Sequence, residues 1–422
     1  MDPLLDLIIS EIPAPNVDTE GGLQFQGSLL DYNDYVGRMA IGRIRRGKIS
    51  LGEMVSCIRT DGSVKNFRVQ KLYSFLGLQR TEIQEAGAGD IIALAGLPDI
   101  YVGETVCTMG QEEALPLIHV SEPTVQMNFS TNDSPFSGKE GKFVTSTKID
   151  ERLYREVQKD VSLKVERIGA GEEWIVSGRG ELHLGILIEN MRREGYEFQV
   201  ARPQAIIKEI DGIPHEPYEY AQIDVPNETI GSVIELLGAR GGIMENMESS
   251  YTQTRLIYTI PSRGLIGLST DFMTASKGYG SLSHYFLEYR PLDNTNFGAR
   301  KLGVLVASQS GKTSAYGIGQ IEDRGILFVE PNEEVYEGQI VGECNKEEDL
   351  SVNVAKTKQM TNQRSANKDT TVVLKRPRKM NLEACLEYIN DDELVEITPR
   401  NIRLRKKILD TASRKKFDAR NK

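Results

Sequence analysis

The sequence predicts a multidomain protein in which an all-β barrel is followed by two α+β domains and a mixed, β-rich C-terminal domain. Three observations lead to this class. The 422 residues are enough for two to four domains. Short β-type runs separated by glycines fill residues 23–107, and two later stretches each place helical patterns between β-type runs. The content of 39% hydrophobic and 27% charged residues is ordinary for a globular protein.

The first part of the chain is predicted to be a helix with a Pro-rich linker, over residues 1–18. Leu4, Leu7 and Ile8 recur at helical spacing, and prolines soon end the pattern. One short helix cannot bury its own apolar face. The segment is therefore either an ordinary leading helix or the end of a domain that precedes it.

Residues 19–115 are predicted to form the β-barrel, because many short strands with glycine corners are typical of small closed barrels. The Asp61-Gly62 pair between two β-type runs indicates a hairpin. A basic cluster lies on or beside another hairpin, and it is either a solvated face or a contact to RNA backbone. Its members are Arg43, Arg45, Arg46 and Lys48.

Two α+β domains follow, over residues 119–202 and 203–291. In the first, a helix over 147–159 and a second helix after Gly180 alternate with β-type runs in the order β-α-β-β-α-β, which is the ferredoxin-like arrangement. The second repeats the scheme. The remainder, 292–422, begins with β-type runs, continues through a basic polar loop, and ends in about twelve residues that we expect to fray.

Positive charge gathers near the C-terminus of a chain whose net charge is −10. Residues 353–379 hold eight basic residues against one acidic residue, and 398–422 hold ten against two. Such segments let an acidic protein meet nucleic-acid phosphates locally. The candidate RNA-binding residues here are Lys356, Lys358, Arg364, Lys368, Lys375, Arg376, Arg378 and Lys379.

Several kinds of site are not indicated. The four cysteines are scattered without a Cys-x-x-Cys pair, and the four histidines have no metal-type spacing, so we expect no metal site. Ser310-Gly311-Lys312-Thr313 looks like the end of a phosphate loop, but Val306 stands where that motif needs glycine. No catalytic side-chain arrangement can be assigned. No apolar stretch reaches membrane-helix length, and no secretory signal is evident, so we expect a cytoplasmic protein.

The string Ser177-Gly178-Arg179-Gly180-Glu181-Leu182-His183-Leu184 predicts a strand end, a tight turn and a helix start. We expect a positive φ at Gly178 or Gly180. Glu181 would lie in the first helical turn, where the helix dipole favours an anion.

This string closely resembles the start of the second helix in domain III of elongation factor G and its relatives. The runs SPFSGKEGKFVTSTKIDERL, EPYEYAQIDVPNETIGSVIELLGARGG and SLLDYNDYVGRMAIGRIRRGKI resemble domains III, V and II of that superfamily. The stretch EDRGILFVEPNEEVYEGQIVGE and the basic loop after it resemble the C-terminal domain of the TypA/BipA translational GTPases.

The resemblance implies a chain that follows a GTP-binding domain, with residues 1–18 as the last helix and linker of that domain. The family's phosphate loop, switch regions and base-recognition motif do not occur in these residues. We therefore expect no enzyme activity and no cofactor here, with GTP and Mg²⁺ serving the full-length protein. Gly178, Gly180 and Glu181 would face the GTP-binding domain.

The expected function is ribosome binding in translation or ribosome assembly under stress, by a monomer with no membrane contact. The implied contacts are rRNA and tRNA in the A site. An alternative is an autonomous RNA-binding or assembly module without a GTPase parent. An enzyme based on Ser310–Thr313 is a third interpretation.

Overall fold

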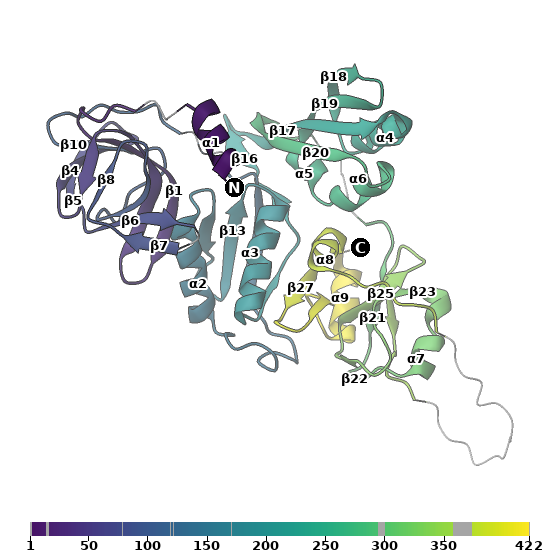
Figure 1. The fold of residues 1–422 in the computed structure, drawn as a ribbon. Helices are drawn as coiled ribbons and strands as arrows, with labels where there is room; N and C mark the ends of the chain where they lie inside the picture. The colour runs from purple at the N-terminus through teal and green to yellow at the C-terminus, as the bar shows by residue number, and fades with distance from the viewer. Residues whose placement is uncertain are drawn as a thin grey trace, which may run out of the picture. The chain divides into compact units, whose positions relative to one another are not determined.

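The computed structural model describes residues 2–13, 17–77, 79–118, 120, 122–169, 171–293, 300–357 and 374–421. The chain divides into two compact units. One contains Met1–Ser121 with Leu153–Leu163, and the other contains Glu122–Arg152 with Lys164–Lys422. Both are rich in strands (Figure 1). None of the described helices is long and apolar enough to cross a membrane.

The first unit is built on one antiparallel sheet with the strand order β5-β4-β10-β1-β2-β9-β6-β7. Strands β3 and β8 form a separate two-stranded sheet. Residues alternate in and out along β2, where Ala40 and Ile44 are buried while Arg45 is exposed. Helix α1 (Asp2–Glu11) buries none of its residues. The strands are β1 (Gln24–Asn33), β2 (Gly37–Arg46), β3 (Lys48–Ser50), β4 (Met54–Ile58), β5 (Val64–Arg68), β6 (Lys71–Leu76), β7 (Gln79–Glu82), β8 (Glu85–Gly87), β9 (Ile91–Ala95) and β10 (Thr105–Thr108).

An eleven-stranded sheet runs through the second unit and joins residues far apart in sequence. Five of its strands come from residues 125–205, a stretch that also contains helices α2 (Ser146–Lys159) and α3 (Glu181–Glu194). These strands are β11 (Val125–Thr131), β12 (Lys164–Arg167), β13 (Glu173–Gly178), β14 (Phe198–Val200) and β15 (Gln204–Ala205). The other strands come from the C-terminal part: β21 (Val304–Ala307), β23 (Gly325–Leu327), β25 (Gln339–Cys344), β26 (Leu350–Val352), β27 (Glu393–Ile397) and β28 (Ile402–Lys406). The two sets meet where β14 pairs with β27, with Val200 opposite Val395.

Residues 204–291 contribute a second, five-stranded sheet to this unit, in the order β16-β17-β19-β18, with β20 also paired to β17. Ile223, Leu256 and Phe272 belong to the core between this sheet and its helices. The elements are β16 (Lys208–Ile210), β17 (Ile213–Pro226), η1 (Asn227–Thr229), α4 (Ile230–Ala239), β18 (Ile243–Ser249), β19 (Gln253–Pro261), α5 (Ser262–Leu265), α6 (Ser269–Ala275) and β20 (Ser281–Pro291).

The C-terminal part adds short elements around its own core of residues such as Leu305, Ile318 and Val341. They are β22 (Gly311–Lys312), α7 (Ala315–Gly319), η2 (Glu322–Arg324), β24 (Glu334–Val335), α8 (Leu382–Tyr388) and α9 (Thr411–Asn421).

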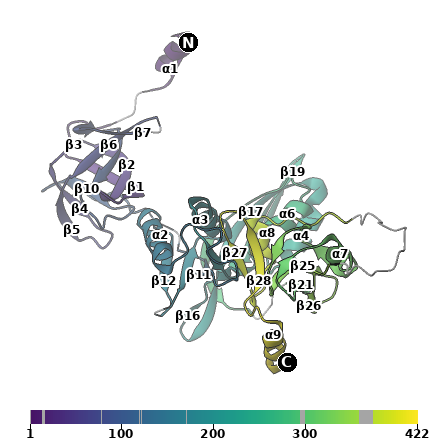
Figure 2. The same cartoon turned by 90° about the horizontal axis from the view of Figure 1, so that it is seen from below.

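Helix α9 replaces the frayed end that the sequence predicted, and Figure 2 shows it close to β28. Its N-terminus is anchored in two ways. The Asp410 carboxylate accepts a hydrogen bond from the Ser413 amide at 2.7 Å, and the Glu337 carboxylate accepts one from the Thr411 amide at 3.0 Å. Such acceptors satisfy amides that have no partner within the helix, which lets a short polar helix form.

Candidate functional site

The turn between β13 and α3 carries the Gly178–Glu181 motif. The amide of Arg179 donates a hydrogen bond to Nδ1 of His183 at 3.2 Å, so a side chain from the first turn of α3 contacts the backbone of the preceding turn. Gly180 has an extended backbone with φ 172°, and Gly178 is not among the positive-φ glycines. The expected positive φ is therefore wrong at both positions. A Cβ on Gly178 would lie 2.8 Å from His183 Nδ1 and 3.0 Å from a Leu184 methyl carbon, so close packing is what requires this glycine.

Glu181 opens helix α3 and turns its carboxylate towards the α5–α6 turn. Its Oε2 accepts a hydrogen bond from the Gly267 amide at 2.9 Å. Burial raises the pKa of Glu181 to about 7, more than the Gly267 hydrogen bond and the Arg240 charge lower it. The contact to Gly267 was not foreseen from the sequence, and the orientation of this turn towards a GTP-binding domain stays a prediction.

A cavity of about 300 Å³ beside Glu181 contains a second polar group. The Ser262 hydroxyl donates to Oε1 of Glu219 at 2.5 Å, and Nδ1 of His284 lies 2.5 Å from Oε2 of the same carboxylate. The hydrogen bond to Glu219 raises the pKa of His284, although burial opposes it. Glu219 thus joins the Ser262 hydroxyl and the His284 ring in one hydrogen-bonded group. Among the described residues no cluster of three potential metal ligands exists.

The Ser310–Thr313 stretch does not fit a nucleotide phosphate. Gly311 and Lys312 pair with β24, and the Thr313 amide donates to the Glu333 carbonyl at 2.8 Å. The Thr313 hydroxyl donates to the Glu330 carbonyl at 2.6 Å. Because these donors are already used in backbone contacts, they cannot cradle phosphate oxygens as a phosphate loop does.

The basic cluster of the first unit has two kinds of members. Arg46 pairs with Glu113 at 2.8 Å, and Lys48 lies 3.8 Å from Glu85. Arg43 and Arg45 have no ion-pair partner among the described residues. Only these two cations are therefore available to a phosphate without first giving up an acidic neighbour.

The basic segment of the C-terminal part shows the same division. Lys358, Arg364 and Lys368 lie outside the described residues, while Lys356 is exposed beside α7. Within the run that follows, the paired cations are Lys375 (4.0 Å from Asp323), Arg378 (3.7 Å from Glu343) and Lys379 (3.2 Å from Glu330). Arg376 is exposed and has no ion pair within the described part of the chain.

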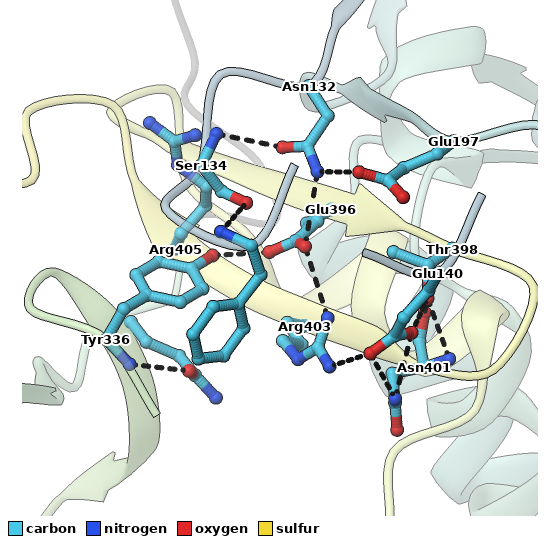
Figure 3. Close-up of polar contacts among 12 residues, drawn as sticks. Asn132, Ser134, Glu140, Glu197, Tyr336, Glu396, Thr398, Asn401, Arg403 and Arg405 are labelled. Atoms are coloured by element: carbon cyan, nitrogen blue, oxygen red, sulfur yellow. Dashed lines mark hydrogen bonds and ion pairs between the residues drawn. The ribbon is translucent and has the colours of Figure 1, made fainter. Parts of the chain in front are cut away.

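Basic residues from the 398–422 segment also take part in a polar network at the β14–β27 junction (Figure 3). Its centre is Glu396, which is fully buried. Glu396 accepts from the Tyr336 hydroxyl at 2.5 Å and from Arg403 at 3.1 Å. Arg403 also contacts Glu140 at 2.5 Å, and the buried Arg405 reaches Gln199 at 3.0 Å.

Glu393, three residues before Glu396 on β27, forms a second buried centre. Arg300 donates to both of its carboxylate oxygens, at 3.0 and 2.7 Å, and Lys406 Nζ lies 2.9 Å from Oε1. Burial would raise the pKa of Glu393, but Arg300 and Lys406 together hold it below its ordinary value. From the sequence, the basic segment 398–422, which includes Arg403, Arg405 and Lys406, was expected to offer positive charge to nucleic-acid phosphates. In the structure these three residues instead fasten β27 and β28 to the strands and loops around them.

Four family models match successive parts of the chain. They are elongation factor Tu domain 2 over residues 37–107, elongation factor G domain III over 142–202, the elongation factor G C-terminus over 214–298 and the TypA/BipA C-terminal domain over 302–411. The prediction of a multidomain, β-rich chain with these elements is confirmed at that level.

Curated relatives match almost the full chain. A protein of Bacillus subtilis (strain 168) named large ribosomal subunit assembly factor BipA is 55% identical over 100% of this chain and 69% of its own length. Proteins of the same name from Synechocystis and Salmonella typhimurium are 51% and 47% identical, over 96% and 99% of this chain and 68% and 69% of their own lengths.

These matches correct one prediction. The class "not an enzyme" was inferred from GTPase motifs that do not occur in these 422 residues. The full chain matches a relative that extends well beyond it, since the matched part is 69% of that relative. Motifs missing from one matched part of a longer relative cannot place the protein among the non-enzymes, so the non-enzyme class was wrong as an inference from them.

Proposed function

This chain belongs to the TypA/BipA family of translational GTPases, and we propose that it acts in assembly of the large ribosomal subunit by binding ribosomal RNA. The observation that carries the proposal is the 55% identity, over the whole chain, to a protein named for that role. The ribosome would be its partner and the cytoplasm its place of action. GTP and Mg²⁺ would serve the full-length protein, and none of the residues described above is proposed as their ligand.

The RNA contact is proposed to lie on the basic residues 356–379, with Arg43 and Arg45 as a second contact. Lys356 and Arg376 support this, because both are exposed cations without an acidic partner among the described residues. Neutralising phosphates releases condensed counterions, so the affinity should fall steeply with salt. A contact to tRNA in the A site and a monomeric state are finer parts of the same proposal.

The finer fold classes are also proposed. They are a closed barrel for residues 19–115, ferredoxin-like domains for 119–202 and 203–291, and a family-specific domain for 292–422. The strand order in the sheet is β20-β17-β19-β18, and along the chain α4 follows β17 while α6 follows β19. This arrangement supports the ferredoxin-like class for 203–291.

The test is co-sedimentation with purified large ribosomal subunits through a sucrose cushion at several KCl concentrations. In one variant Lys356, Lys358, Arg364 and Lys368 are all changed to Ala. We expect weaker binding and a salt dependence of log K that is shallower by roughly 0.7–0.9 for each phosphate that the variant no longer neutralises.

The matched control removes four cations that already have acidic partners, so it has the same change in net charge. Its residues are Lys65, Lys71, Arg80 and Lys277. If the first variant sediments like the wild type, or if the control loses as much binding, the proposed contact is wrong.

A further inference from the structure

The last helix carries exposed cations beside a cavity that the proposed RNA contact does not use. Lys407, Lys415, Lys416 and Arg420 are exposed, and none has an ion pair among the described residues. Helix α9 is anchored at its first turn by Glu337, through the Thr411 amide. This contact fixes the position of the first turn of α9, and the exposed cations follow along the rest of the helix.

Between α9 and the strands lies a cavity of about 520 Å³, a size that suits a small organic group. Val306 and Ile408 supply apolar lining, and Phe417 adds an aromatic ring. Phe417 is 52% exposed, so its ring is open to a ligand. The cavity therefore combines an exposed aromatic ring with the exposed cations Lys407 and Lys415.

The acidic residues that line the cavity already have partners. Asp349 and Asp392 each lie 2.6 Å from Lys406 Nζ, and Lys406 is buried. Asp391 lies 3.9 Å from Arg202. Three aspartates and four cations therefore line the cavity, and Lys407 and Lys415 are the two exposed cations among them.

We infer that this cavity holds one unstacked nucleotide of single-stranded RNA, with its base against Phe417 and its phosphates at Lys407 and Lys415. The inference rests on the proposed function and deepens it, because it names a second RNA subsite. Bases stack on aromatic side chains in single strands, whereas a base inside a duplex is not accessible. The phosphates on either side of the base need cations at the cavity rim, and the two lysines provide them.

The first measurement is the affinity of the full chain for a fluorescein-labelled 12-nucleotide single-stranded RNA and for a duplex of the same length. Phe417→Leu keeps an apolar side chain but removes the ring. It should weaken single-strand binding roughly 5- to 100-fold, the range expected for loss of one base stack, and leave duplex binding unchanged. Phe417→Tyr should restore the affinity.

Tyr251→Leu is the matched control, since Tyr251 is an aromatic residue with 99% exposure that does not line this cavity. It should bind both RNAs like the wild type. A second variant, Lys407→Ala with Lys415→Ala, should weaken binding of both RNAs and reduce the salt slope by roughly 0.7 per phosphate contact for the single strand.

Unchanged single-strand affinity of Phe417→Leu would overturn the inference, as would an equal loss on the duplex. The result is independent of subunit sedimentation. If the variant of residues 356–368 sediments normally while Phe417→Leu loses single-strand affinity, the main contact is wrong and this subsite stands. The reverse pattern removes this subsite alone.

Discussion

Residues 398–406 and 407–421 adjoin in one basic C-terminal segment, yet their cations have opposite surroundings. Arg405 is 1% exposed and Lys406 3%, and both are held by carboxylates or amides. Lys407 and Lys415 are exposed and have no ion pair within the described residues. The comparison teaches that local net charge does not measure what a partner can use, because burial and pairing remove charges that the count includes.

The largest effect should come from removing a buried carboxylate. Glu393→Ala leaves Arg300 and Lys406 facing each other without their shared anion. Breaking a buried ion pair from one side costs about 3–5 kcal/mol, so we expect a loss of that size in the free energy of unfolding. Urea denaturation followed by circular dichroism measures it. Lys416→Ala, from the exposed half, should stay within about 0.5 kcal/mol; similar losses in the two variants would end the comparison.

The pattern of elements was predictable, but the fate of these charges was not. Helical spacing of Leu184, Leu187 and Ile188 was enough to predict α3. Nothing local in the sequence indicates that Arg405 meets Asp133, a residue 272 positions earlier. That contact depends on β14 pairing with β27, which is a long-range choice among many possible strand partners.

The same limit applies to the candidate site. The sequence placed Glu181 in the first turn of α3, but its partner Gly267 lies 86 residues later. Gly178 was singled out for a positive φ that it does not have, whereas the structure shows close contacts around its missing Cβ. A backbone angle can be guessed from a motif, whereas a neighbour such as the His183 ring becomes visible only after folding.

Glu181 sharpens the comparison between paired and unpaired charges, because it is a largely buried carboxylate whose pKa is raised to about 7 by burial. A raised folded-state pKa means that the folded protein holds its proton more tightly than the unfolded chain. The stabilisation is therefore complete below about pH 4.5 and is lost as the pH rises through about 7. Over that window the wild type should lose on the order of 1–3 kcal/mol.

Glu181→Gln should remove this loss, since an amide does not titrate. The measurement is the urea midpoint from pH 5 to pH 8 for both proteins. The expected result is a midpoint that falls with pH more steeply in the wild type than in the variant. Parallel curves would show that Glu181 is ionised throughout, as a well-paired carboxylate would be.

A smaller effect is expected at the turn itself. Gly178→Ala places a methyl carbon 2.8 Å from His183 Nδ1, so the ring or the helix start has to shift. We expect a loss of about 1–2 kcal/mol, as for mild overpacking. Gly180→Ala meets no atom within 4 Å and has an extended backbone, so it should be neutral within about 0.5 kcal/mol. Thermal unfolding of the two variants, side by side, tests whether packing or backbone conformation governs this turn.

The smallest effect should separate two neighbouring cations of the proposed RNA contact. Arg376 has no ion pair among the described residues, whereas Lys379 lies 3.2 Å from Glu330. A phosphate that binds Lys379 must displace Glu330, and giving up that attraction offsets part of the gain. Arg376 offers two parallel donors at no such cost. Binding to large ribosomal subunits, measured over a KCl series, should therefore lose roughly 0.7–0.9 of its log–log slope in Arg376→Ala and less than half of that in Lys379→Ala. If Lys379→Ala has the larger effect, a phosphate displaces Glu330 from Lys379 at little cost. Ion pairing in the free protein would then not predict which cations bind the RNA.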